Sequence, residues 1–216
     1  MGIITISRGS YSDSREVAQK LSQKLGYDCI TREDLLTSSN QFNIPEIQLT
    51  EDYENAFSVF DNIKGGMRLY SAFIREAFLE RILKDNVIYE GFVGQYFAKG
   101  IPNVLKVRLI TDIDRRIKIM MQKKNIDEDS ARFLLQKIDS ERRKWSMSLY
   151  CIDSCITELY DVVLHIKNLT TDNAVDILYD FANEPCFKST EESMSRIQEL
   201  LTAAKEYSKI QFDSVK

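Results

Sequence analysis

The strand, loop and helix at the start of the chain constrain its fold most. The apolar, β-branched residues 3–6 predict a short buried strand. Residues 8–13 form a loop, and a helix begins at Ser14 and ends at Gly26. The first N–H groups of a helix have no intrahelical partner and bind anions readily. The segment therefore predicts an anion site between the first strand and the first helix.

Apolar runs of strand length recur along the chain and alternate with helix-period segments. We expect strands at residues 3–6, 29–30, 87–89, 104–110 and 162–166. Several of these runs lack polar alternation, as strands buried on both faces do. The alternation predicts an α/β fold with a mostly parallel sheet that helices cover on both faces.

The expected helices have readable ends. Beyond the first helix we expect helices at 67–84, 113–123 capped by Asp112, 128–144 capped by Asp127, 172–182 capped by Thr170 or Thr171, and 191–207. Ser189 and Glu192 have the spacing of a capping box for the last helix. Residues 38–51 read as an insertion and 52–64 as a short helix. Pro185 breaks the pattern, so the tail beyond Glu184 looks appended.

Composition limits the class of protein. The 216 residues are 44% hydrophobic, enough for one sizeable α/β domain with a core. A net charge of −4 disfavours nucleic-acid binding driven by bulk charge. We expect no membrane span, since no apolar stretch approaches about 18 residues. The chain enters a strand without a signal peptide, and its four cysteines suit a reducing cytosol, so we expect a cytoplasmic protein.

The first loop keeps the spacing of the phosphate-loop pattern G-x-x-x-x-G-K-[ST] but changes its chemistry. The frame reads Gly9, Ser10, Tyr11, Ser12, Asp13, Ser14, Arg15 and Glu16. Arg15 stands where lysine bridges the β- and γ-phosphates of a triphosphate, and Arg8 is nearby. An ordinary strand-to-helix turn is the alternative interpretation.

Four replacements make this a degenerate Walker A loop. Tyr11, Asp13 and Ser14 occupy places where glycine lets the backbone approach phosphate, and a side chain forced to positive φ costs about 1–2 kcal/mol. A carboxylate at Asp13 about 4 Å from a phosphate charge costs about 4 kcal/mol at an effective dielectric of 20. Glu16 replaces the hydroxyl that binds Mg²⁺, and a carboxylate also binds hard cations, so Glu16 is a candidate metal ligand.

A second glycine-containing loop follows the strand at 87–89. Its candidates are Glu90, Gly91, Gly94 and Gln95. Ligands of parallel α/β sheets lie outside the carboxyl ends of the strands, which favours a binding role. The alternative is a turn that uses glycine for its dihedral angles.

A basic helix carries a third set of candidates. Arg142 and Arg143 have the donor geometry to hold a transferring phosphoryl group, and Asp139 can orient one of them. A solvated charged face is the alternative, and the pair at Arg115 and Arg116 has the same ambiguity.

A metal site at Cys151, Cys155 and His165 is disfavoured. The two cysteines have helical spacing without a second pair, and His165 alternates within a strand.

Blocks of residues in one order carry a family resemblance. Ser14-Arg15-Glu16-Val17-Ala18 looks like the G-R-E-[IV]-A of a nucleotide-binding loop. Further matching blocks lie at 25–27, 31–33, 75–79, 90–95, 101–108, 114–117, 137–143 and 159–164. From Ile3 to about Ala182 the chain resembles the cytidylate kinase-like family, a branch of the P-loop nucleoside monophosphate kinases.

The resemblance implies a three-layer P-loop kinase-like fold with a five-stranded parallel sheet, a helical lid at about 124–150 and an extra C-terminal helix. The kinase-like domain would span residues 1–184 and the helical extension 185–216. ATP and Mg²⁺ would bind at the first loop, with Arg15 on the donor phosphates and Arg115 near the donor nucleotide. Arg32 and Arg75 would hold a CMP-like acceptor, and Arg142 and Arg143 would close over the phosphoryl group.

The chain departs from the family pattern at Phe92, where the family has an arginine, and at Thr31, where it has an aspartate. The resemblance therefore implies phosphoryl transfer from ATP to a nucleoside monophosphate at a reduced rate. The alternative is a catalytically inactive nucleotide-sensing or protein-interaction module. A homodimer or a partner domain could use the C-terminal helix.

Overall fold

The computed structural model describes residues 1–38 and 66–214. Its centre is a five-stranded sheet in the order β2-β3-β1-β4-β5, and every neighbouring pair is parallel. The strands are β1 (Ile3–Arg8), β2 (Asp28–Thr31), β3 (Val87–Glu90), β4 (Val104–Thr111) and β5 (Val162–Ile166). The expected α/β fold with its five parallel strands is confirmed.

The described ranges also contain helices and short 3₁₀ turns. They are α1 (Ser14–Leu25), α2 (Arg32–Ser38), α4 (Gly66–Ile82), α5 (Gly94–Phe97), α6 (Ile113–Lys124), α7 (Glu128–Tyr150), η3 (Thr157–Leu159), α8 (Thr171–Asn183), η4 (Pro185–Phe187) and α9 (Glu191–Asp213). The expected insertion at 38–51 and the short helix at 52–64 lie outside the described residues, apart from Ser38 at the end of α2.

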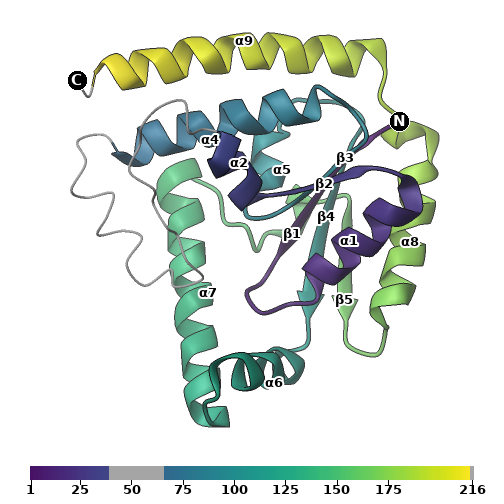
Figure 1. Cartoon of the computed structure of the whole chain (residues 1–216), viewed down its shortest axis with the longest axis vertical. Helices are drawn as coiled ribbons and strands as arrows, with labels where there is room; N and C mark the ends of the chain where they lie inside the picture. The colour runs from purple at the N-terminus through teal and green to yellow at the C-terminus, as the bar shows by residue number, and fades with distance from the viewer. Residues whose placement is uncertain (39–65, 215–216) are drawn as a thin grey trace.

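Alternate residues of the buried strands face two separate cores. Ile4 and Ile6 of β1 pack with α1 and α8, whereas Ile3 packs on the opposite face of the sheet. That opposite face carries α4, α5 and the C-terminal part of α7 (Figure 1). Because successive strand side chains point to opposite faces, an unbroken apolar run supplies both cores.

Helix boundaries follow the expected caps at most ends. Asp112, Asp127 and Thr170 accept hydrogen bonds from backbone N–H groups at the starts of α6, α7 and α8. The expected capping box at Ser189 and Glu192 is wrong, since Thr190 is the cap and exchanges bonds with Ser193. Both α7 and α9 extend six residues beyond their expected ends at 144 and 207.

Helix α9 lies along the outer side of α4 (Figure 1). Ile197, Leu201 and Ala204 are buried in the same core as α4 and β3. Lys205 Nζ lies 2.7 Å from Glu80 Oε1, which adds an ion pair between the two helices. The C-terminal extension is thus docked on the core. No helix in the described ranges is long and apolar enough to cross a membrane.

Candidate functional site

The candidate site lies where β1, β3 and β4 end. Ligands of parallel sheets bind at this edge, outside the carboxyl ends of the strands. A cavity of about 120 Å³ opens there between the first loop, the end of β4 and helices α6 and α7. Its lining includes Arg8, Gly9, Phe92, Arg108, Thr111, Arg116, Asp139, Arg142 and Arg143.

The first loop departs from ordinary backbone geometry at one of the three replaced glycine positions. Tyr11 has a φ of 51°, in the left-handed region that glycine prefers. Asp13 has a φ of −80°, and Ser14 is the first residue of α1. The backbone cost of replacing glycine, about 1–2 kcal/mol, is therefore confined to Tyr11.

The carboxylate of Asp13 is held by a neighbouring arginine. Arg115 Nη2 lies 3.0 Å from Asp13 Oδ1, and the hydroxyl of Thr111 donates to Oδ2 over 3.4 Å. Asp13 is buried, and a buried carboxylate needs a partner for its charge. Arg115 supplies that partner, and it thereby reduces the repulsion between Asp13 and an anion bound in the loop. Arg115 thus pairs with the first loop, and its place near a donor nucleotide stays a prediction.

Arg116, for which the sequence left a binding role and a solvated face open, is buried against the first loop. Its Nε donates to the carbonyl of Ser10 over 2.7 Å, and its Nη2 donates to the hydroxyl of Ser10 over 2.9 Å. The same Nη2 lies 2.8 Å from Asp139 Oδ1, which also accepts from Ser10 Oγ over 2.8 Å. Arg116 therefore joins the first loop to both α6 and α7.

Gly9 makes room for this guanidinium group. A Cβ atom at Gly9 would lie 3.2 Å from Arg116 Cζ. The sequence contains a signal that Arg116 is buried: it adjoins the apolar Ile117 and is four residues, about one helical turn, from Met120. All three are buried on one face of α6, whereas Arg115 is half-buried and pairs with Asp13.

Glu90 joins the first loop to the end of β3. Arg8 Nε donates to Glu90 Oε1, and the hydroxyl of Ser14 donates to the same oxygen over 2.8 Å. Glu90 is 3% exposed, so its charge depends on Arg8 for compensation. The structure thus brings together Arg8, Ser14 and Glu90, three of the predicted residues.

The two arginines of the basic helix have different surroundings. Arg142 is buried, donates to the carbonyl of Arg8 over 3.3 Å and lies 5.0 Å above the ring of Phe92. Arg143 is exposed, and its Nη2 atom lies 2.5 Å from Asp153 Oδ2. Phe92 therefore forms an apolar support for Arg142 where the family pattern has a cation.

The second loop uses its glycines for packing. A Cβ atom at Gly91 would lie 2.5 Å from the hydroxyl of Tyr89, and one at Gly94 would lie 2.6 Å from Tyr89 Cδ1. Gln95 is buried, and its side-chain N and O atoms have no hydrogen-bond partner among the described residues. The geometry thus accounts for both glycines through Tyr89.

Several predicted residues do not line this cavity, and four of them have other surroundings. Arg15 is exposed on α1. Glu16 accepts from Lys20 and Thr171, and these bonds lower the pKa of its carboxyl. Arg32 donates to the hydroxyl of Tyr70 over 2.7 Å in a second pocket, and Arg75 lines a third. The role of Glu16 as a metal ligand stays a prediction.

Residues 10–14 contain the remaining polar groups of the loop. Ser12 Oγ lies 3.1 Å from Ser14 Oγ, next to the Glu90 carboxylate. Hydroxyl and carboxylate oxygens are ligands that Mg²⁺ accepts, so Ser14 and Glu90 form a suitable donor pair.

Within the described ranges, no three His, Cys, Asp or Glu side chains cluster as a metal site, and His165, Cys151 and Cys155 are exposed.

Comparisons with known proteins show which family the chain resembles. The sequence profile of the Cytidylate kinase-like family matches residues 3–168. A cytidylate kinase of Thermoplasma acidophilum is 26% identical over 166 residues, 76% of this chain and 83% of that protein. A cytidylate kinase of Sulfolobus acidocaldarius is 24% identical over 176 residues, 81% of this chain and 91% of that protein.

Solved structures show the same fold. An uncharacterized protein of Eubacterium ventriosum superposes with a TM-score of 0.65 at 18% identity, over 83% of this chain and 96% of that one. A shikimate kinase of Bacteroides thetaiotaomicron gives a TM-score of 0.53 at 10% identity, over 85% and 99%. Since the family profile covers most of the chain and the parallel sheet has its expected architecture, the chain belongs to the cytidylate kinase-like family.

Proposed function

We propose that this chain transfers the terminal phosphoryl group of ATP to a nucleoside monophosphate, with CMP and UMP as the acceptors to test. The observation that carries the proposal is the meeting of three guanidinium groups at the first loop. Arg8, Arg116 and Arg142 all line the cavity beside Gly9. Phosphoryl transfer depends mostly on positioning and charge neutralisation, which arginines supply.

The residues of the site divide this work between them. Arg142 reaches the carbonyl of Arg8 from α7, so its guanidinium is placed to neutralise charge on a phosphoryl group in the cavity. Ser14 and Glu90 would hold Mg²⁺, which would supply neutralisation of phosphate charge. Arg115 keeps the Asp13 carboxylate from repelling the donor. Arg15 and Arg143 remain predicted phosphate ligands on more exposed positions.

We expect a slow enzyme for two reasons. Phe92 stands where the family pattern has an acceptor arginine, so one cation is missing from the charge balance. Asp139 adds a carboxylate 2.8 Å from Arg116 Nη2, which competes with phosphate for that guanidinium. Both effects lower the turnover number without removing the fold of the site.

A catalytically inactive nucleotide-binding module is the second candidate. It is favoured by the contacts of Ser10, whose carbonyl and hydroxyl are both engaged by Arg116. The cavity of about 120 Å³ is also smaller than the few hundred Å³ usual for small-molecule sites. A whole nucleotide therefore requires α6 or α7 to shift, whereas a single phosphoryl group does not.

Calorimetric titration separates the two candidates. ATP·Mg²⁺ is titrated first, and CMP or UMP is then added to the loaded protein, followed by a coupled assay for ADP. Binding of both ligands with ADP formation that Arg142→Gln lowers at least tenfold supports the kinase. Arg132→Gln is the matched control, since Arg132 pairs with Glu128 on the exposed face of α7. ATP binding without any ADP formation supports the inactive module.

A further inference from the structure

Strand β5 forms one edge of the sheet, and its outer side pairs with no strand in the described ranges. The carbonyl of Ile166 accepts from the N–H of Asp112, which follows β4, so the backbone groups of Ile166 face β4. Because successive strand residues direct these groups to opposite sides, those of Val163 and His165 face away from the sheet. The His165 carbonyl accepts from Lys167 N–H over 3.1 Å and keeps a second acceptor position. The edge thus offers backbone donors and acceptors to a further strand.

This edge lacks the features that usually protect an edge strand. Charged side chains and proline on the edge prevent pairing with another chain. The strand reads Val162-Val163-Leu164-His165-Ile166, without lysine, arginine, carboxylate or proline. Val163 is 37% exposed, on the sheet face that also carries Ile110, which is 36% exposed. The outer side of β5 is therefore both unpaired within the described ranges and bordered by apolar surface.

Helix α8 adds apolar surface beside the same edge. Its flank toward α1 is polar, since Lys20 of α1 pairs with Asp172 over 2.6 Å. Phe181 is nine residues beyond Asp172, about two and a half helical turns, so it lies on the flank away from α1. Helix α1 covers the inner strands and α8 lies outward of it (Figure 1), so that flank is on the side of the β5 edge. Phe181 is 41% exposed there.

The sequence around β5 complements itself in one antiparallel register. When Leu164 lies opposite Leu164 of a second copy, Val163 lies opposite His165, and such a pair exchanges two backbone hydrogen bonds. Asp161, which precedes the strand, then lies opposite Lys167, which follows it. Two-fold symmetry repeats this pairing of carboxylate and ammonium groups at the other end of the strand.

The end residues are placed for this pairing, and it is specific to the register. The N–H of Lys106 donates to Asp161 Oδ2 over 2.8 Å, which holds the carboxylate at the start of the strand. The side chain of Lys167 is 63% exposed, with its Nζ 3.5 Å from Asp112 Oδ2. A shift of the register by two residues places Lys167 opposite Leu159 or Val163, so the match of charges is lost.

We propose that two copies of this chain associate through β5, in the antiparallel register centred on Leu164, and so join their sheets into one. The occupant of the edge is a second copy because the segment matches itself in charge and in backbone geometry. Two-fold pairing of identical surfaces is also the commonest symmetry of homodimers. Phe181 would contact the facing α8, and Leu164 would pack on its own symmetry mate. The interface is β5 with α8, not the C-terminal helix α9.

Sedimentation velocity of the full chain over a concentration series is the measurement. We expect a species of twice the 25.1 kDa mass of the chain, in equilibrium with the monomer at a Kd on the order of 10 μM, because the contact is small. Val163→Pro removes an N–H group that faces away from β4, so it should raise the Kd at least tenfold while the sheet stays intact. Phe181→Ser should raise the Kd at least fivefold.

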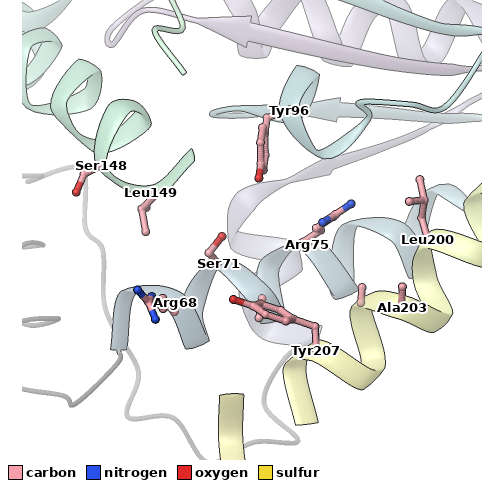
Figure 2. Close-up of a pocket in the computed structure, with 11 residues that line it drawn as sticks. Arg68, Ser71, Arg75, Tyr96, Ser148, Leu149, Leu200, Ala203 and Tyr207 are labelled. Carbon is pink, nitrogen blue, oxygen red and sulfur yellow. The ribbon is translucent and has the colours of Figure 1, made fainter. Parts of the chain in front are cut away.

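Tyr207→Ser is the matched control for the loss of an exposed aromatic ring. Tyr207 is 47% exposed and belongs to α9, where Figure 2 shows it in the cavity between α4 and α9. Its replacement should leave the Kd of the dimer unchanged. Thermal unfolding of each variant verifies folding. A dimer that Tyr207→Ser dissociates, and that Val163→Pro and Phe181→Ser leave intact, would place the interface on α9 and overturn the proposal.

An exchange of charges tests the register. Lys167→Glu brings two carboxylates together at each end of the pairing, and Asp161→Lys brings two ammonium groups together, so each variant alone should raise the Kd at least tenfold. A mixture of the two variants restores opposite charges at both ends and should form a heterodimer more tightly than either variant self-associates. The proposal is also overturned if the unmodified chain stays monomeric at about 200 μM. The same holds if the two folded variants associate no better together than apart.

Discussion

Asp13 introduces a negative charge into the first loop, and Arg115 compensates it across 3.0 Å. We expect Arg115→Gln to weaken ATP·Mg²⁺ binding roughly tenfold, about 1.4 kcal/mol, because the carboxylate then repels the phosphates. Asp13→Asn alone should change the Kd less than about threefold. The double variant Asp13→Asn/Arg115→Gln should recover most of the loss. Titration calorimetry measures all four proteins. A double variant as weak as Arg115→Gln would show instead that Arg115 binds the donor directly.

Cys29 differs from the other three cysteines in its surroundings. Burial, with a smaller contribution from Glu90, raises the pKa of its thiol to about 11. Cys151, Cys155 and Cys186 are exposed. At pH 8 an ordinary thiol with a pKa near 8.5 is about one-quarter thiolate, whereas Cys29 is on the order of 0.1%. Iodoacetamide should therefore label Cys29 about a hundredfold more slowly, and its rate should rise about tenfold per pH unit. Timed labelling with peptide mass spectrometry measures this, and comparable rates at pH 8 would contradict it.

Tertiary contacts give different roles to residues whose local sequence pattern is the same. Arg115 and Arg116 are adjacent and chemically identical, and helix phase alone turns Arg116 toward Ser10 and Arg115 toward Asp13. Ser189 and Thr190 both precede a polar residue by three positions, so either could cap α9. Ser189 instead donates to Asp85 Oδ1 over 2.7 Å, which leaves the cap to Thr190. Such choices depend on neighbours distant in sequence.

At the scale of elements, the strands could be predicted well because each is an apolar run bounded by polar residues. The ends of α7 and α9 could not be predicted, because their last turns are stabilised by buried contacts with distant residues. Tyr150 at the end of α7, for example, is buried in the main core. The sequence indicated that Arg8, Ser14 and Glu90 lie at strand ends but not that they meet, which depends on the pairing of β1 with β3. Arg32 and Arg75 were expected in one acceptor site but line different pockets. This separation could not be predicted, because it depends on which faces of α4 the other helices cover.

Helix α9 stabilises the molecule through its buried face. Leu201 is 4% exposed in the core shared with α4, whereas Ile210 of the same helix is 63% exposed. We expect Leu201→Ala to lower the free energy of unfolding by about 2–5 kcal/mol. The control Ile210→Ala should stay within about 0.5 kcal/mol. Urea denaturation followed by circular dichroism measures both. A loss below about 1 kcal/mol for Leu201→Ala would mean that α9 is not part of the core.

The whole molecule is expected to unfold in a single step because its largest core joins distant segments. Trp145 is the one tryptophan of the chain and is 1% exposed in that core. Its ring centroid lies 6.1 Å from the ring centroid of Tyr70. Tryptophan fluorescence and far-ultraviolet circular dichroism should therefore give the same midpoint in urea. A fluorescence midpoint at clearly lower urea would show that α7 detaches before the sheet unfolds.

The packing of α9 on α4 also sets an order of assembly during synthesis. The core formed by β1, β4, β5, α1 and α8 contains no described residue beyond Phe187. It can close as soon as α8 leaves the ribosome, since chains fold from the N-terminus as they are made. The opposite core needs Ile197, Leu201 and Ala204, so α4 keeps apolar surface exposed until α9 emerges. The nascent chain thus passes through a stage with one finished face and one open face, where a chaperone could bind.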